Sequence, residues 1–313
     1  TNRPAAGYEG TGTAATQGRG GISSAGTLAL QTGVLDNEAG FIGATGALTA
    51  TTAGAINTAG AVLQSATSVQ MNAGAGSYDN RGGQTLSGGE LSVSAGRIDN
   101  AAGLMQAADR VKLDAEQVAN TGTLRGVLPQ AALAGTAAGS DLGIQGKNVA
   151  ITANTLDNTG GAIRTEQDLR VTSVGSVDNS GGLMAAGKSL EIADAGSPGG
   201  RALAMSNADG VLAANERVAL NARRINSIGL ITSAQDIAID QIEDINNTGE
   251  VNAGRDLSIT TSGNLHNSGK LTAGQALTVS AQDIENTASG EMSASTTRIR
   301  AAGTLTTPGL IHG

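Results

Sequence analysis

The sequence predicts an all-β fold, a parallel β-helix that winds into roughly 14 coils of about 20 residues each. The first observation behind this prediction is internal repetition, which is clearest in residues 245–290. There Asn247, Asn267 and Asn286 each precede a turn of small residues, and they lie 20 and then 19 residues apart. The apolar positions between them recur in one order. A fixed period of this length is the sequence signature of a solenoid.

The second observation is the alternation of apolar residues within each repeat. Val251 pairs with Ala253, and Leu257 pairs with Ile259, each two positions apart. Successive side chains of a strand point to opposite faces, so this spacing predicts strands. Glycine occurs in the turns between the pairs, and a 20-residue unit is too short for two helices. Each unit is therefore predicted to hold three short strands, which is the size of one β-helix coil.

Composition excludes several other classes. The chain has 313 residues with 47 Gly but only 4 Pro, and it lacks the strict Gly period of collagen. Its hydrophobic content of 39% is regularly placed, which opposes disorder. There is no Cys, no apolar stretch long enough for a membrane span and no signal peptide, so we expect an internal fragment. The net charge of −8 argues against nucleic acid as a partner.

The expected domain organisation is simple. Residues 1–21 show no alternation and are interpreted as an irregular lead-in or a degenerate coil. Residues 22–313 form the repeat domain. In its first coil the core positions run as Ile22, Ser24, Leu28, Leu30 and Leu35, and later coils repeat this spacing.

An asparagine marks the corner of nearly every coil. The predicted structural column consists of Asn37, Asn57, Asn80, Asn100, Asn120, Asn158, Asn179, Asn207, Asn226, Asn247, Asn267 and Asn286. Stacked coils bring like side chains to about 4.8 Å, where amides form a hydrogen-bonded ladder. Asn also tolerates the left-handed backbone of a tight corner. These residues are therefore predicted to be structural.

Two gaps between the markers exceed the usual length. The gap of 38 residues after Asn120 indicates either two coils, the second without its Asn, or one coil with a loop at residues 127–141. The loop is favoured because this tract alternates poorly and contains Pro129. The gap of 28 residues after Asn179 predicts a loop insertion at residues 195–200. Insertions in solenoids go to surface loops, often on the functional face.

These repeats resemble the repeat region of the filamentous haemagglutinin family. The family's turn motif is matched by Leu35-Asp36-Asn37, Ile98-Asp99-Asn100, Leu156-Asp157-Asn158 and Val177-Asp178-Asn179. The resemblance covers residues 22–306. It implies a right-handed parallel β-helix on the bacterial surface, exported through an outer-membrane two-partner secretion transporter as an adhesin or a contact-dependent growth-inhibition effector. An Arg-Gly-Asp tripeptide and dense basic clusters are absent, so no receptor is carried over.

Few residues offer catalytic chemistry. The only histidines, His266 and His312, are far apart, so no metal site or Ser-His-Asp site is predicted, and no cofactor is implied. Parallel β-helices include polysaccharide lyases, and Asp236 and Asp256 should stack in consecutive coils as a candidate acid pair. The favoured interpretation is structural, with these carboxylates accepting backbone N–H groups at a corner and Arg217 relieving their repulsion.

We therefore expect a non-enzymatic protein, the rigid shaft of a secreted or surface-bound bacterial filament or adhesin. It would present or contribute to binding of a receptor or glycan on host or neighbouring cells, through the loops or along the shaft itself. The alternative is a β-helix polysaccharide lyase or hydrolase that uses Asp236 and Asp256.

Overall fold

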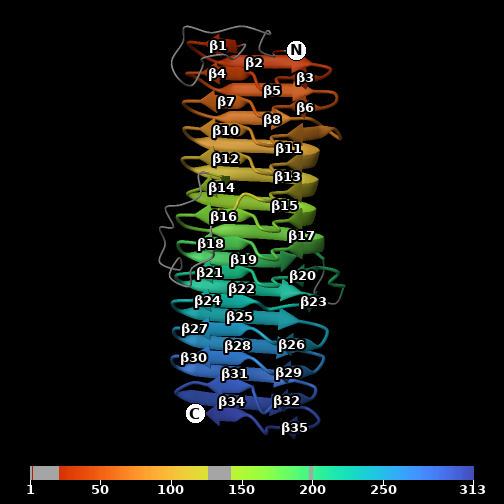
Figure 1. The fold of residues 1–313 in the computed structure, drawn as a ribbon, viewed down its shortest axis with the longest axis vertical. Helices are drawn as coiled ribbons and strands as arrows, with labels where there is room; N and C mark the ends of the chain where they lie inside the picture. The colour runs from red at the N-terminus through yellow and green to blue at the C-terminus, as the bar shows by residue number, and fades with distance from the viewer. Residues whose placement is uncertain (1, 3–20, 126–141, 197–199) are drawn as a thin grey trace. The chain divides into compact units, whose positions relative to one another are not determined.

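The computed structural model describes residues 2, 21–125, 142–196 and 200–313. Within these ranges the secondary structure is all β, with parallel sheets stacked as a β-solenoid of about 14 turns (Figure 1). The predicted fold class is confirmed. The chain divides into two compact units: Thr1–Arg125 with Gly139–Leu156 and Ala162–Arg164, and Gly126–Ala138 with Asp157–Gly161 and Thr165–Gly313.

Each coil of the first unit has three sides. The first side holds β1 (Gly21–Ser24), β4 (Phe41–Ala44), β7 (Val62–Ser65), β10 (Gln84–Ser87), β12 (Leu104–Ala107), β14 (Gly143–Gly146) and β16 (Ala162–Thr165). The second side holds β2 (Leu28–Thr32), β5 (Leu48–Thr52) and β8 (Val69–Asn72), and the third holds β3 (Leu35–Asp36), β6 (Ile56–Asn57) and β9 (Ser77–Asp79). The ten-residue strands β11 (Glu90–Asp99), β13 (Arg110–Ala119) and β15 (Asn148–Asp157) run along the second and third sides without a break.

The second unit repeats this plan. Its first side holds β18 (Leu183–Ala186), β21 (Val211–Ala214), β24 (Leu230–Ser233), β27 (Glu250–Ala253), β30 (Lys270–Ala273), β33 (Glu291–Ser293) and β36 (Leu310–His312). Its second side holds β17 (Leu169–Asp178), which continues along the third side, and then β19 (Ser189–Asp194), β22 (Arg217–Ala222), β25 (Asp236–Gln241), β28 (Asp256–Thr261), β31 (Ala276–Ala281) and β34 (Thr296–Ala301). Its third side holds β20 (Ala204–Ser206) and β23 (Arg224–Ile225), and then β26 (Ile245–Asn247), β29 (Leu265–Asn267), β32 (Ile284–Asn286) and β35 (Leu305–Thr306).

Parallel pairing places like residues on top of each other. Leu257 of β28 is the register partner of Leu277 of β31, and both side chains are at most 1% exposed. In the first unit Ile22 pairs with Ile42 in the same way. Full burial of one such aliphatic side chain contributes about 1.5–3 kcal/mol. The apolar spacing seen in the sequence is therefore the inward face of successive coils.

A buried tyrosine interrupts the aliphatic core of the first unit. Tyr78 of β9 is the register partner of Ile56 and Ile98, and its side chain is fully buried. Its Oη lies 2.6 Å from Oγ1 of Thr85, which in turn donates to Oδ1 of Asn80 at 3.0 Å. Thr85 stands where the neighbouring coils have Leu63 and Met105. The hydroxyl of Thr85 thus satisfies a phenol that an aliphatic core would leave without a partner.

Burial raises the pKa of Tyr78 to about 12, against about 10 for an unperturbed tyrosine. The unfolded chain therefore loses this proton first, and the stability contributed by the neutral phenol is lost as the pH rises from about 10 to about 12. We expect the free energy of unfolding to fall over this range by about 2–3 kcal/mol more in the native protein than in Tyr78→Phe. Urea unfolding of both proteins between pH 9 and pH 12 measures this difference. Parallel curves would show that Tyr78 ionises without hindrance in the folded state.

Parts of the predicted organisation lie outside the described residues. These are the loop at 127–141, the centre of the excursion at 195–200, and residues 1–21 apart from Asn2 and Gly21. Within the described ranges, the structure contains no helix with the length and apolar character that a bilayer crossing requires.

Candidate functional site

The most extensive polar feature of the first unit is the asparagine column. Asn80, Asn100 and Asn120 are completely buried at the corner that follows the third side. Nδ2 of Asn80 donates to Oδ1 of Asn100 at 2.7 Å, and Nδ2 of Asn100 donates to Oδ1 of Asn120 at 2.8 Å. The second hydrogen of Asn80 reaches the carbonyl of Leu104 in the next coil at 3.1 Å. Asn80 therefore joins its own coil to the next through both a side-chain and a backbone acceptor, and Asn100 joins its coil to the next through the side chain of Asn120.

The second unit contains two such ladders. Their links are Asn158 to Asn179 at 2.6 Å, Asn179 to Asn207 at 2.7 Å, Asn247 to Asn267 at 2.7 Å and Asn267 to Asn286 at 2.8 Å. All six side chains are completely buried. In a site of low dielectric constant, fully satisfied amide chains strengthen each other and are costly to break.

The structure corrects two members of the predicted column. Asn57 is the register partner of Asp36 and Asp79 and is only half-buried, while Thr58 occupies the buried position. Asn226 is exposed, and there Nδ2 of Asn207 donates instead to the backbone carbonyl of Ile228 at 2.6 Å. A shift of one residue turns a side chain to the opposite face. Alignment on the nearest asparagine could not detect that shift.

The aspartate before the buried asparagine has a separate task. Oδ1 of Asp79 accepts the N–H of Arg81 at 3.1 Å, and Oδ1 of Asp178 accepts the N–H of Ser180 at 2.9 Å. Asn57 does the same for Ala59 at 3.1 Å. Such bonds between a side chain and the backbone two residues later stabilise tight turns. The Leu-Asp-Asn motif thus supplies a core residue, a turn residue and a ladder residue in order.

One ladder is incomplete because Thr58 occupies the position where other coils have a buried asparagine. Asn37 is buried and accepts a hydrogen bond from Asn2 at 2.6 Å, but its own Nδ2 has no partner among the described residues. The third residue after a column asparagine is commonly glycine, because a Cβ at Gly83 would lie 2.9 Å from Oδ1 of Asn80. After Thr58 this position is Ala61. Thr58 and Ala61 therefore depart together from the usual pairing of a column asparagine with a glycine three residues later.

This match predicts that the two residues are energetically coupled. Thr58→Asn alone should be neutral or destabilising, because the new amide oxygen meets the methyl group of Ala61. Thr58→Asn with Ala61→Gly should provide the missing acceptor for Asn37. We expect a coupling energy of about 1–2 kcal/mol in a double-mutant cycle measured by urea unfolding. Additive effects of the two substitutions would contradict the pairing.

The candidate acid pair lies on the second side of the second unit. Asp236 and Asp256 begin consecutive strands, β25 and β28, whose next residues are register partners. Nε of Arg255 donates to Oδ1 of Asp236 at 2.7 Å, and its Nη2 is paired with Oδ2. Oδ1 of Asp256 accepts the backbone N–H of Ala276 at 3.2 Å. Arg255, rather than Arg217, is therefore the direct partner of Asp236.

This geometry has a chemical consequence. The hydrogen bonds from Arg255 lower the pKa of Asp236, although partial burial opposes the shift. A carboxyl that stays ionised is a poor proton donor at neutral pH. The contacts of both carboxylates therefore match the structural interpretation better than that of an acid pair.

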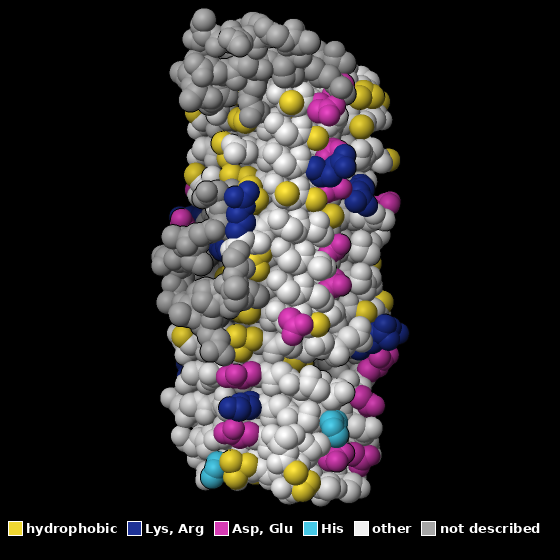
Figure 2. Space-filling view, in the orientation of Figure 1, with side chains coloured by type: hydrophobic (Ala, Val, Ile, Leu, Met, Phe, Trp, Pro, Cys, Tyr) yellow, Lys and Arg dark blue, Asp and Glu magenta, His cyan; other side chains and the backbone are white. Residues whose placement is uncertain are grey.

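One of the two histidines forms a local pair. Nδ1 of His266 lies 3.0 Å from Oε2 of Glu285 in the next coil, and His312 lies in β36. No group of side chains suited to hold a metal ion occurs in the part of the chain that the structure describes. On the face shown in Figure 2, Lys and Arg side chains lie beside Asp and Glu side chains rather than in one continuous basic patch.

The residues that flank the excursion at 195–200 form polar contacts that sequence analysis missed. Oδ2 of Asp194 accepts the N–H groups of Ala202 and Leu203, each at 2.6 Å. The side chain of Arg201 is only 10% exposed, and its Nη2 donates to Oδ2 of Asp240 at 2.6 Å. Desolvation opposes ionisation of Asp194, but the backbone donors outweigh it and lower its pKa. Asp194 and Arg201, on either side of the excursion, are thus bonded to neighbouring parts of the solenoid.

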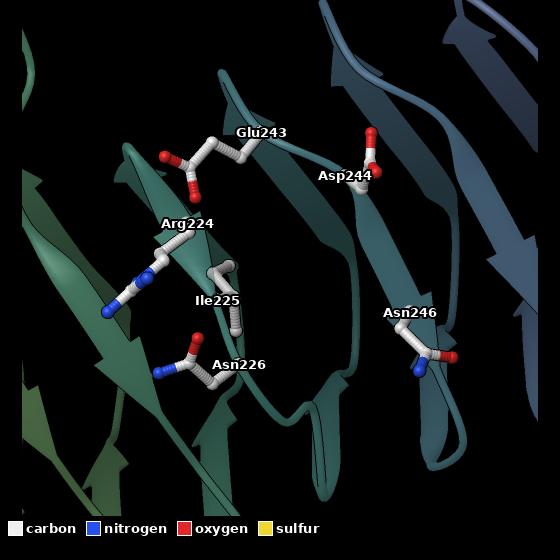
Figure 3. Close-up of a pocket in the computed structure, with 6 residues that line it drawn as sticks. All are labelled: Arg224, Ile225, Asn226, Glu243, Asp244 and Asn246. Atoms are coloured by element: carbon white, nitrogen blue, oxygen red, sulfur yellow. The ribbon is translucent and has the colours of Figure 1, made fainter.

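A cleft opens on the third side of the second unit, where β23 and β26 belong to different sheets. It has a volume of about 440 Å³, and its lining residues are drawn in Figure 3: Arg224, Ile225, Asn226, Glu243, Asp244 and Asn246. Gln241, which is 2% exposed, is hydrogen-bonded to the backbone of two lining residues, Ile225 and Asp244. Sequence analysis missed this cleft. The one sequence feature near the cleft was Asn226, which was assigned to the asparagine column. In the structure, Nδ2 of Asn207 donates to the backbone carbonyl of Ile228 instead of to Asn226.

Comparison with known proteins agrees with the family resemblance of the turn motifs. The family model described as haemagglutinin repeat matches residues 5–75, 64–197, 201–269 and 266–307. Searches of curated proteins and of solved structures found no match. The family model covers nearly the whole chain, including every Leu-Asp-Asn turn described above. The chain is a repeat region of the filamentous haemagglutinin family.

Proposed function

We infer that this chain is part of the rigid shaft of an exported bacterial surface filament or adhesin, which presents or contributes to binding of host or neighbouring cells. The observation that carries this proposal is that buried polar side chains join one coil to the next. Asn100 and Asn179 each link two neighbouring coils through completely buried amides. A scaffold needs this continuity, whereas a catalytic pocket does not.

The partners follow from the same proposal. An outer-membrane two-partner secretion transporter would export the chain, and a surface receptor or glycan would be bound by the filament, which places the protein outside the cell. The net charge of −8 and the pairing of surface cations with carboxylates, as for Arg170 with Glu191 at 3.4 Å, give no support to a nucleic-acid partner.

Single-molecule pulling tests the mechanical part. Residues 22–313 are placed between two marker domains and compared with a Gly/Ser linker of equal length. We expect the chain to hold its length until discrete unfolding events, because neighbouring coils are joined by backbone and side-chain hydrogen bonds. Smooth extension like that of the linker would contradict a shaft.

Cell adhesion and enzyme assays test the rest. Beads coated with the chain should bind host or bacterial cells, or should hold a fused binding domain so that it still captures its ligand. Incubation with a panel of acidic and neutral polysaccharides should release no reducing ends. Polysaccharide cleavage that disappears in Asp256→Asn would overturn the proposal in favour of a lyase or hydrolase.

A further inference from the structure

The cleft on the third side arises where the backbone ladder is interrupted. In the preceding coil the N–H of Asn226 donates to the carbonyl of Met205 at 2.8 Å, and in the following one the N–H of Ile245 donates to Asn264 at 2.7 Å. Among the described residues, β23 and β26 belong to different sheets and are not paired with each other. Four positions separate Gln241 from Ile245, whereas three separate its register partner Ala222 from Ile225. The extra residue displaces β26 from the ladder.

The side chain of Gln241 bridges the interruption. Its Oε1 accepts the N–H of Ile225 at 3.2 Å, and its Nε2 donates to the carbonyl of Asp244 at 2.8 Å. In a regular ladder the N–H of Ile225 would donate directly to the carbonyl of Asp244, as the N–H of Ile245 does to Asn264. One amide group is thus inserted between the two strands. At this point the two strands are bridged by a side-chain amide instead of bonding directly.

Further along the same edges lies a second pair of backbone groups. The carbonyl of Ile225 and the N–H of Asn246 lie on strands β23 and β26, which no sheet pairing joins within the described residues. They are the next donor and acceptor of the interrupted ladder, by analogy with Asn226 and Met205. Exposed strand edges of this kind pair readily with an added strand. A second amide, aligned with that of Gln241, would satisfy both.

Charges at the cleft define which strand fits. Arg224 is an exposed lining residue on the β23 wall (Figure 3), and none of the ion pairs among the described residues includes it. On the other wall Oδ1 of Asp244 accepts the N–H of Asn264 at 2.7 Å, and Glu243 lies 3.6 Å from Arg223. The cation is therefore the charge left for a ligand. An acidic side chain aligned with Arg224 would pair with it.

We propose that this cleft binds an extended peptide segment, which adds as a parallel strand between β23 and β26 and carries an acidic residue beside Arg224. The backbone of the segment accepts a hydrogen bond from the N–H of Asn246 and donates one to the carbonyl of Ile225. The proposal does not depend on the shaft function, because it rests on the interrupted ladder alone.

The test uses fluorescence anisotropy with the whole chain and a labelled pentapeptide, Ac-Gly-Glu-Val-Asn-Gly-NH2. We expect saturable binding that weakens at least tenfold when the valine is N-methylated, because the methyl group removes an N–H of the added strand. Exchange of the peptide's glutamate for lysine should have a similar effect. Binding that ignores both changes, or no binding at millimolar peptide, would overturn the proposal.

A charge exchange on the protein provides the matched control. Arg224→Glu, at an exposed position, should lose the glutamate peptide and gain the lysine peptide by at least tenfold, with an unchanged circular dichroism spectrum. Asn252→Glu, on the exposed face of β27, should leave both affinities unchanged. If N-acetylglucosamine oligomers bind and displace the peptide at lower concentration, the cleft recognises an acetamido sugar, and the peptide assignment is wrong.

Discussion

Replacement of Asn267 by alanine is expected to lower the free energy of unfolding by about 3–5 kcal/mol. The native side chain accepts from Asn247 at 2.7 Å and donates to Asn286 at 2.8 Å and to the carbonyl of Glu291 at 3.2 Å. Alanine removes all three bonds and leaves three buried polar partners with reduced hydrogen bonding. Such losses exceed the usual effect of a point mutation.

Hydrogen exchange is the suitable measurement, because solenoid coils can unfold locally as well as together. Amides of β26, β29 and β32 should lose protection in Asn267→Ala. Asn252→Ala removes an exposed asparagine from β27 and should change stability by less than about 0.5 kcal/mol. Asn267→Asp separates volume from hydrogen bonding, because it keeps the shape but loses the donor. An aspartate variant as stable as the native protein would contradict the ladder.

Replacement of Gly182 by alanine is expected to cost about 3 kcal/mol or more, because the coils approach each other too closely for a methyl group. A Cβ at this position would lie 2.3 Å from the carbonyl oxygen of Asn158 in the preceding coil and 2.7 Å from Oδ1 of Asn179. Both atoms belong to the stacked corner and cannot move without breaking the ladder. Thermal unfolding and exchange of the amides in β18 measure the effect.

The adjacent glycine supplies the control. Gly181 has φ of +60°, but a methyl group there would meet nothing within 4 Å, so alanine carries only the cost of a left-handed backbone, about 1–2 kcal/mol. Gly33→Ala, which meets neither obstacle, should be close to neutral. The expected order of stability is therefore Gly33→Ala, then Gly181→Ala, then Gly182→Ala. Equal effects at 181 and 182 would show that coil contact does not limit this corner.

The repeat period of the sequence was enough to predict most of the fold. Because the side chains of a strand alternate strictly, the spacing of Leu257 and Ile259 identified inward-facing positions, and repetition 20 residues later identified their stacking partners, Leu277 and Val279. Such local periodicity is visible without coordinates. The direct partner of Asp236 was not: both Arg217 and Arg255 are near it in the repeat, and only side-chain geometry shows that Arg255 forms the ion pair.

By itself the sequence determined the solenoid, the core positions and the turn motif, since each depends on a pattern that repeats from coil to coil. Only the tertiary structure decided what happens where that pattern fails. At Thr58 a threonine replaces the asparagine of the ladder. Asp194 and Arg201, which flank an insertion, form hydrogen bonds and an ion pair with the solenoid. Between β23 and β26 the amide of Gln241 takes the place of a direct backbone hydrogen bond. The physical reason is that a backbone ladder depends on the relative positions of two strands, and a single extra residue alters these positions while the apolar spacing stays almost unchanged.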